Sequence, residues 1–237
     1  MKKTFLALTV VASFLSCGKS LNDIPKSVQT GLLAWYPFSD DDKDMSGNKR
    51  NPLIDQGTLI TEKNITCLRL EGNDIFQTSL KGVSGNGSRT LSLWVKTLFG
   101  NSPDEYVGTG TPQTNGYGDS FMFLVSNNIQ GQASVAKDIS NSMWYYPLNN
   151  LNSWHHYAMV YDNKAGTTSG SIKVYQDGVL LTNSLFDCCN PDLPINTTLS
   201  NFQSQYFGNG AVLLDDIRFY NRPLSQQDLK DVIKTRY

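Results

Sequence analysis

The feature that most constrains this chain is a series of short segments in which hydrophobic residues recur at every second position. In TLSLWVK, the side chains of Leu91, Leu93 and Val95 fall on one face of an extended strand, and TCLRLEG and VLLDDIRFY also indicate strands. DSFMFLVS is a nearly continuous hydrophobic run, typical of a strand covered on both faces. Glycine, asparagine and serine turns separate these segments. The 237 residues therefore predict an all-β fold, a sandwich of two antiparallel sheets.

Two further segments predict local structure with definite ends. IKVYQDGVLL indicates a hairpin, because Asp177 and Gly178 supply the positive φ that a type I′ turn requires. In NRPLSQQDLKDVIKTRY, Ser225 is a natural N-cap, and Asp228 three residues later completes a capping-box pattern. We therefore expect a C-terminal helix of about ten residues on the edge of the sandwich.

The first residues indicate export. Lys2 and Lys3 precede a hydrophobic stretch that is too short to span a bilayer, as in a signal peptide. Cys17 at its end resembles the acylated cysteine of a bacterial lipoprotein, which implies a signal peptide over residues 1–16, a lipid on Cys17 and a polar tether over residues 17–30. The expected location is the cell envelope, with the membrane bound through the lipid. An ordinary signal peptide cut near Ser20 is the alternative.

The composition narrows the range of partners. The chain has 20 lysine and arginine against 21 aspartate and glutamate residues, a net charge of -1, and its basic residues do not cluster. Nucleic acid is therefore excluded as a partner, since phosphate binding requires a basic face. With Cys17 acylated, Cys67, Cys188 and Cys189 remain, so at most one internal disulfide can form, from Cys67 to either of the other two.

Four segments in order resemble the laminin-G-like family of concanavalin A-like jelly rolls. They are GLLAWYPFSDDDKDMSGN, TLSLWVK, WHHYAMVYD with IKVYQDGVLL, and LLDDIRFYNRPLSQQDL. The resemblance spans about residues 31 to 235 and implies one jelly-roll domain over residues 31–237. Members of this family usually bind glycans or proteins, but a fold shared so widely does not define one function.

The two histidines of the chain, His155 and His156, are adjacent in WHHYAMVYD. Side chains alternate along a strand, so the two rings point to opposite faces and cannot jointly bind a metal or relay a proton. No nucleophile-elbow motif or zinc-type histidine spacing accompanies them. We interpret both as structural residues.

The acidic run SDDDKDMSGN predicts a calcium site, because Ca²⁺ prefers clustered oxygen ligands. It is not an EF-hand, since Met45 stands where that loop needs glycine. The family resemblance places this run near the Asp-Asp strand and supports a structural Ca²⁺. The alternative is a solvated acidic turn. On that resemblance, the nominated ligands are Asp44, Asn48 and Asp216, with Asp40 and Asp215.

Glycoside hydrolysis needs two carboxylates about 5 Å or about 6.5–9.5 Å apart around the sugar. The glutamates are not spaced as on glycosidase strands, and strand alternation points Asp215 and Asp216 to opposite faces. The sequence therefore predicts no catalytic residues.

Ligand contacts are expected in the loop-rich stretch 97–150, where aromatic rings can stack on a sugar or a protein. An alternative for Trp144 and one of the tyrosines is the core. The candidate ligand contacts are Trp144, Tyr145, Tyr146, Tyr106 and Tyr117.

The interpretation that follows is an exported, lipid-anchored, non-catalytic binding or adhesion module for a carbohydrate or an extracellular-matrix ligand. A glycan-degrading enzyme and a structural envelope lipoprotein are the alternatives.

Overall fold

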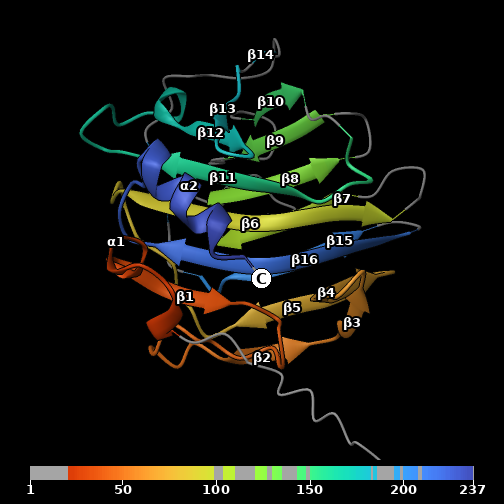
Figure 1. Cartoon of the computed structure of the whole chain (residues 1–237). Coiled ribbons are helices and arrows are strands. Elements are labelled where there is room, and N and C mark those ends of the chain that lie inside the picture. Colours follow the sequence, from red (N-terminus) through yellow and green to blue (C-terminus); the bar gives the residue numbers. More distant parts are fainter. Residues whose placement is uncertain are drawn as a thin grey trace, which may run out of the picture.

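The computed structural model describes residues 21–98, 104–109, 121–126, 130–134, 143–147, 150–182, 184–185, 195–197, 200–207 and 210–236. Two antiparallel sheets stack face to face, and two short helices lie over the outer face of one of them (Figure 1). The predicted all-β sandwich with a C-terminal helix is confirmed. In the described part of the chain, no helix is both long and apolar enough to cross a bilayer.

The first sheet carries the helices. Its strands are β1 (Leu32–Tyr36), β3 (Thr58–Glu62), β4 (Ile65–Glu71), β6 (Arg89–Leu98), β11 (His155–Tyr161), β12 (Lys173–Gln176), β13 (Val179–Leu180) and β16 (Ala211–Tyr220). The order is β13-β12-β11-β6-β16-β4-β3, and β1 also pairs with β16. Strands β6 and β16, each of ten residues, form its centre.

The second sheet forms the other layer. Its strands are β2 (Pro52–Asp55), β5 (Ile75–Thr78), β7 (Asp104–Thr109), β8 (Phe121–Ser126), β9 (Gln130–Ser134), β10 (Met143–Pro147), β14 (Ser184–Leu185) and β15 (Gln203–Phe207). The order is β14-β10-β9-β8-β7-β15-β5-β2. Four of these strands lie in the stretch 97–150, so this part of the chain has more regular structure than its loop-rich composition predicts.

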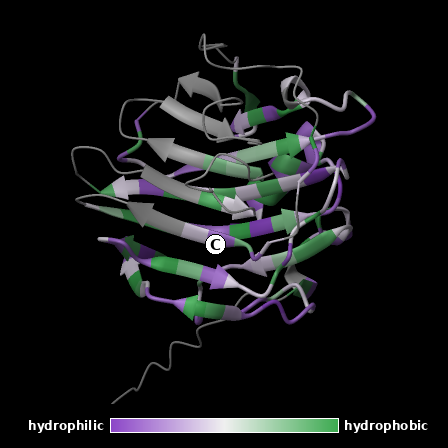
Figure 2. Cartoon of the chain, turned by 180° about the vertical axis from the view of Figure 1, so that it is seen from behind, coloured by the Kyte–Doolittle hydropathy of each residue, from purple (hydrophilic) through white to green (hydrophobic). Residues whose placement is uncertain are grey.

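Two hydrophobic cores flank the first sheet. The inner core lies between the sheets and contains Leu91, Leu93 and Val95 of β6, as the two-residue repeat predicts. The outer core lies between the first sheet and the helices, and it contains Trp35 and Leu229. Seen from behind, the strands carry hydrophobic and hydrophilic residues in close succession (Figure 2). The first sheet is therefore buried on both faces, which explains why every residue of β16 is buried.

The folded unit begins before residue 31, which corrects the extent of the predicted tether. Leu21–Asp23 forms a 3₁₀ turn and Lys26–Gln29 forms helix α1. Ile24 and Val28 are only 3% and 0% exposed, and both belong to the outer core. The spacing of Leu21, Ile24 and Val28 is that of one helical face, a signal hidden in a polar segment. Residues 21–30 are therefore packed against the domain.

The predicted hairpin and helix are both present. At the turn between β12 and β13, Asp177 and Gly178 have φ angles of 51° and 77°, as a type I′ turn requires. Helix α2 (Gln226–Lys234) begins after Ser225, whose hydroxyl accepts the Asp228 N–H while the Asp228 carboxylate accepts the Ser225 N–H. Leu229 of this helix is buried against the first sheet, in the outer core.

Strand β16 changes its partner midway. Residues 211–214 pair with β4 and residues 217–220 pair with β1, while the register against β6 shifts between Asp215 and Arg218. Asp216 lies at this bulge with a φ of 50°, a conformation that aspartate tolerates better than most residues. The bulge lets one strand serve two neighbours on the same edge.

A buried ion pair holds the bulge. The Arg218 guanidinium donates to both Asp216 carboxylate oxygens at 3.0 Å, and both side chains are fully buried. The Trp35 indole Nε1 donates to Asp216 Oδ1 at 2.6 Å, and the Arg218 guanidinium lies 4.8 Å from the centroid of the Trp35 ring. The network therefore joins β1 to β16 where their pairing begins.

Removing one member of this pair leaves the other charge buried. We expect Arg218→Met and Asp216→Asn each to lower the free energy of unfolding by about 3–5 kcal/mol, measured by urea denaturation. Asparagine tolerates the positive φ, so the second variant tests the charge and not the backbone. The matched control is Asp231→Asn on α2, whose partly exposed ion pair should cost under about 0.5 kcal/mol. An Arg218→Met protein as stable as the wild type would contradict this.

Candidate functional site

His156 is part of the outer layer of the first sheet and has no open face. It is fully buried, its Nε2 lies 2.8 Å from the Ser92 hydroxyl, and its ring packs edge-on against Trp94. Its Nδ1 is buried without a hydrogen-bond partner in the described part of the chain, so no described carboxylate orients the ring. Burial lowers the pKa of His156 to about 4 and keeps it neutral. Ser92 is equally buried, so this Ser–His pair cannot reach a substrate.

His155 points to the other face, as strand alternation predicts. Its Nδ1 lies 2.7 Å from Asp177 Oδ2, and Asp177 Oδ1 accepts the main-chain N–H of His156 at 2.9 Å. Asp177 is the first residue of the hairpin turn between β12 and β13. The carboxylate therefore ties β11 to that turn, which is a structural role for both histidines.

The acidic loop is organised around Asp44. Its Oδ1 accepts the N–H groups of Trp35 and Ser46 at 3.0 and 2.8 Å. Its Oδ2 accepts the Arg50 N–H and the Ser46 hydroxyl at 2.8 and 2.9 Å. Asn48 Nδ2 donates to the carbonyls of Leu32 and Leu33. The four groups that donate to Asp44 match the four lone-pair sites of its carboxylate. In this arrangement Asp44 therefore does not fit the role of a calcium ligand.

Two of the three other nominated aspartates, Asp215 and Asp216, are paired with arginines. Alternation predicts opposite faces for Asp215 and Asp216, but the bulge breaks the alternation. Asp216 binds Arg218, and Asp215 accepts from Arg236 Nε at 2.9 Å. Arg236 follows α2 and stacks on Trp94 at 4.1 Å, so both carboxylates face the helix-covered layer.

Asp40 is exposed in the same acidic loop. Among the described residues, no three His, Cys, Asp or Glu side chains gather as a metal site. Calcium in this loop stays a prediction, and an ion at Asp216 would have to displace Arg218.

Most of the predicted aromatic ligand contacts lie on strands of the second sheet. Trp144, Tyr145 and Tyr146 form the middle of β10, which pairs with β9 and β14, and Tyr106 lies in β7 beside β15. They are strand residues, not loop residues. Tyr117 and the acylation candidate Cys17 lie outside the described residues.

The disulfide prediction also stays open. Cys67 is buried in β4 and unbridged among the described residues, and Cys188 and Cys189 lie outside them.

A hollow of about 340 Å³ opens on the outer side of the first sheet, beside the start of α2. Its floor is apolar and belongs to the outer core, with Val160 of β11, Tyr175 of β12 and Leu224. Polar side chains surround the floor, among them Asp162, Ser171 and Lys173. The sequence does not reveal this hollow, because its residues come from three separate segments.

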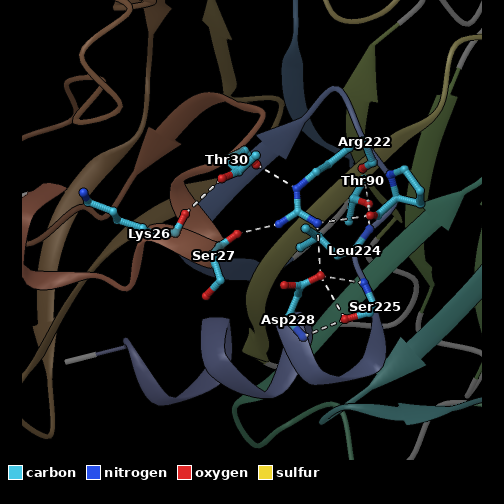
Figure 3. A network of polar contacts seen from close by, with 9 residues as sticks. Lys26, Ser27, Thr30, Thr90, Arg222, Leu224, Ser225 and Asp228 are labelled. Carbon is cyan, nitrogen blue, oxygen red and sulfur yellow. Dashed lines mark hydrogen bonds and ion pairs between the residues drawn. The ribbon is translucent and has the colours of Figure 1, made fainter.

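Arg222 fixes the wall of this hollow that precedes α2. Its guanidinium donates to the carbonyls of Ser27 and Thr30 at 2.6 and 2.8 Å and to the Asp228 carboxylate at 3.0 Å (Figure 3). The Thr90 hydroxyl accepts the Leu224 N–H at 3.0 Å and donates to the Arg222 carbonyl. The segment that leads into α2 is therefore held from β6, α1 and α2 at once.

Two stacked antiparallel sheets with helices on one outer face define a jelly-roll sandwich of the lectin type. The model of the concanavalin A-like lectin/glucanases superfamily matches residues 70–230, more than half of the chain. The chain belongs to this superfamily, as the sequence resemblance predicts. None of the curated proteins matches the chain.

Solved structures with the same fold include several binding domains of bacterial toxins. A structure of botulinum neurotoxin type C, whose cell entry depends on two ganglioside molecules, aligns with a TM-score of 0.65 at 11% identity, over 90% of this chain and 53% of that one. The binding domain of Paraclostridial Mosquitocidal Protein 1 aligns with a TM-score of 0.60 at 14% identity, over 86% and 52%.

The binding domain of botulinum neurotoxin DC, solved with rat synaptotagmin II, aligns with a TM-score of 0.62 at 10% identity, over 89% and 52%. The chain spans about half the length of these proteins. At such identities the likeness establishes the fold alone.

Burial of His156 makes stability depend on pH. In the unfolded chain, the His156 imidazole takes up a proton near its ordinary pKa of 6.5, whereas in the folded chain its pKa is about 4. Stability is therefore lost as the pH falls through this window, by roughly 3 kcal/mol in total. In urea denaturation between pH 7.5 and 4.5, the His156→Gln variant should lose less stability than the wild type. Parallel curves for the wild type and His156→Gln would refute the assignment.

Proposed function

We propose that this protein is a non-catalytic binding module that recognises a carbohydrate or an extracellular protein. The observation that carries the proposal is membership of a lectin and glucanase superfamily together with a fold shared by toxin binding domains. Among those structures, one concerns gangliosides and another holds a synaptotagmin, so proteins that contain this fold bind both ligand classes.

The buried acid and base groups of β11 and β16 support binding over hydrolysis. A glycosidase needs one carboxyl group to protonate the leaving oxygen and a second to activate water or attack the sugar. Asp215 and Asp216 are instead ion-paired with Arg236 and Arg218, and both are about 1% exposed or less. His156 is buried and neutral, with no access to a substrate. These groups stabilise the sandwich and are not placed for chemistry.

We also propose export to the cell envelope and lipid anchoring through Cys17. Leu21 is the first described residue of the packed domain, and three residues, 18–20, lie between it and the acylated cysteine. An extended chain advances at most about 3.6 Å per residue, which gives a reach of roughly 15 Å. The anchored domain would then lie directly against the membrane surface. Its ligand-binding face must therefore point sideways or away from the bilayer.

The binding proposal predicts retention without cleavage. On a panel of immobilised neutral and acidic glycans and of extracellular-matrix proteins, the folded domain should bind at least one member. Incubation with soluble forms of the same glycans should release no reducing sugar. Release of sugar would support the glycan-degrading alternative, and failure to bind any member would favour a structural envelope protein. An unrelated lipoprotein domain of similar charge serves as the control.

Lipid anchoring through Cys17 predicts that a single substitution moves the protein from the membrane fraction to the soluble fraction. With Cys17 intact, the exported protein should sediment with membranes and carry an acylated N-terminal cysteine by mass spectrometry. Cys17→Ser should remove the lipid and shift the protein to the soluble exported fraction, because no second lipid remains to hold it. Cys67→Ser, a cysteine buried in β4, is the matched control and should stay with the membrane. A membrane-bound Cys17→Ser protein would exclude this anchor.

A further inference from the structure

The hollow beside α2 contains polar groups that the fold does not use. Tyr175 is 8% exposed, yet its hydroxyl has no hydrogen-bond partner within the described structure. Among the described residues, the hydroxyls of Tyr157 and Tyr161 are buried and have no hydrogen-bond partner, whereas that of Tyr175 is not among the buried atoms and so reaches solvent. Burial of the ring raises the pKa of Tyr175, so this hydroxyl stays protonated and can donate.

Three further groups around the same floor are available. Lys173 makes no ion pair with any residue that the structure describes, although Asp162 lines the same hollow. Asp162 uses Oδ1 to accept the Lys164 N–H at 3.0 Å, and its Oδ2 has no partner within the described residues. The Ser171 hydroxyl occupies space that opens only because residue 166 is a glycine, since a Cβ there would lie 2.1 Å from Ser171 Oγ. The hollow therefore offers an acceptor, a cationic donor and two hydroxyls.

This set of groups selects a ligand by charge. Asp162 is an acceptor with a negative charge, and Lys173 is a donor with a positive charge. An anionic ligand would be repelled by Asp162, and a cationic ligand would be repelled by Lys173. A neutral ligand with several hydroxyls can instead donate to Asp162 and accept from Lys173. Hydroxyls on neighbouring carbons of a sugar ring have this dual character. Gln226 adds an acceptor, since its amide nitrogen already donates to the Gly178 carbonyl.

The floor suits the flat apolar side of such a ring. Val160, Tyr175 and Leu224 are each at most 8% exposed, and all three belong to the outer core. Ligand sites generally combine an apolar surface with a few placed polar groups. A volume of about 340 Å³ is at the small end of ligand pockets, which fits a single ring.

We propose that this hollow, formed by β11, β12 and the segment before α2, binds one neutral sugar unit of a glycan ligand. The inference rests on the proposed binding function and deepens it by naming a site and a ligand class. Tyr175 and Lys173 donate to sugar oxygens, Asp162 accepts from a sugar hydroxyl, and the ring lies on the outer-core floor. Arg222 and the capping box of α2 are positioning groups, because they hold Leu224 and Ser225 in place.

The test uses the folded domain and methyl glycosides of glucose, galactose, mannose and N-acetylglucosamine at millimolar concentrations. Backbone amide NMR should show saturable shifts for at least one glycoside, concentrated in residues 160–175 and 223–226. Tyr175→Phe removes one hydroxyl and keeps the ring, and Lys173→Met removes the charge and keeps the stem. Each should raise the Kd roughly fivefold to tenfold, the effect of one lost hydrogen bond.

Matched controls separate the site from general effects on folding. Tyr157→Phe deletes a hydroxyl in the inner core, and Lys230→Met removes an exposed charge on α2, so neither should change the Kd. Asp162→Asn should weaken the neutral glycoside and improve binding of glucuronic acid relative to it, because only the Lys173 charge then remains. A merely structural role for Asp162 would not change the affinity for glucuronic acid relative to that for the neutral glycoside.

The outcomes distinguish this inference from the broader function. Glycoside shifts elsewhere, or a Kd unchanged in Tyr175→Phe and Lys173→Met, would place the sugar in another site and overturn the inference while the binding function stands. Binding of glycans or proteins on the panel without any glycoside shift in the hollow would do the same. A wild-type domain that binds neither panel nor glycosides would overturn both.

Discussion

The buried Asp216–Arg218 pair, capped by the Trp35 indole, is the interaction on which the rest of the architecture depends. Strand β16 must pair with β4 along its first half and with β1 along its second, and the bulge at Asp216 makes that change of partner possible. The Asp216 side chain at the bulge is not exposed to water, so its negative charge must be neutralised inside the sandwich. Arg218 neutralises this charge and the Trp35 indole donates a hydrogen bond to it, and β1 is thereby held against the centre of the first sheet.

The same principle accounts for three further carboxylates among the described residues. Asp44 is saturated by loop N–H groups, Asp177 joins β11 to the hairpin turn, and Asp215 pairs with Arg236. Each carboxylate satisfies backbone or cationic groups that the two-sheet packing would otherwise leave without partners. The hollow beside α2 differs, because there Tyr175, Lys173 and Asp162 keep unused hydrogen-bonding capacity at an apolar floor. Structure and recognition therefore occupy different parts of the outer layer.

Much of the fold followed from local patterns. The two-residue repeat of β6, the Asp-Gly turn after β12 and the capping box of α2 are each governed by interactions between near neighbours in the chain. The functional candidates fared differently. Alternation predicts opposite faces for Asp215 and Asp216, but the bulge in β16 breaks that alternation. A bulge arises from the pairing of neighbouring strands and leaves no pattern in the local sequence. For Trp144 to Tyr146 the sequence predicts a loop and the structure shows strand β10, since short strands with glycine and asparagine neighbours resemble loops in composition.

The sequence alone determined the class of fold, the opposed directions of His155 and His156, and the ends of the last helix. Those features depend on side-chain periodicity and on contacts within a few residues. Only the tertiary structure decided that residues 21–30 pack on the domain, that arginines neutralise the aspartates of β16, and that residues near 160, 173 and 224 form one hollow. Such features require segments far apart in the chain to meet, and their free energy comes from burial and charge pairing across the sheets.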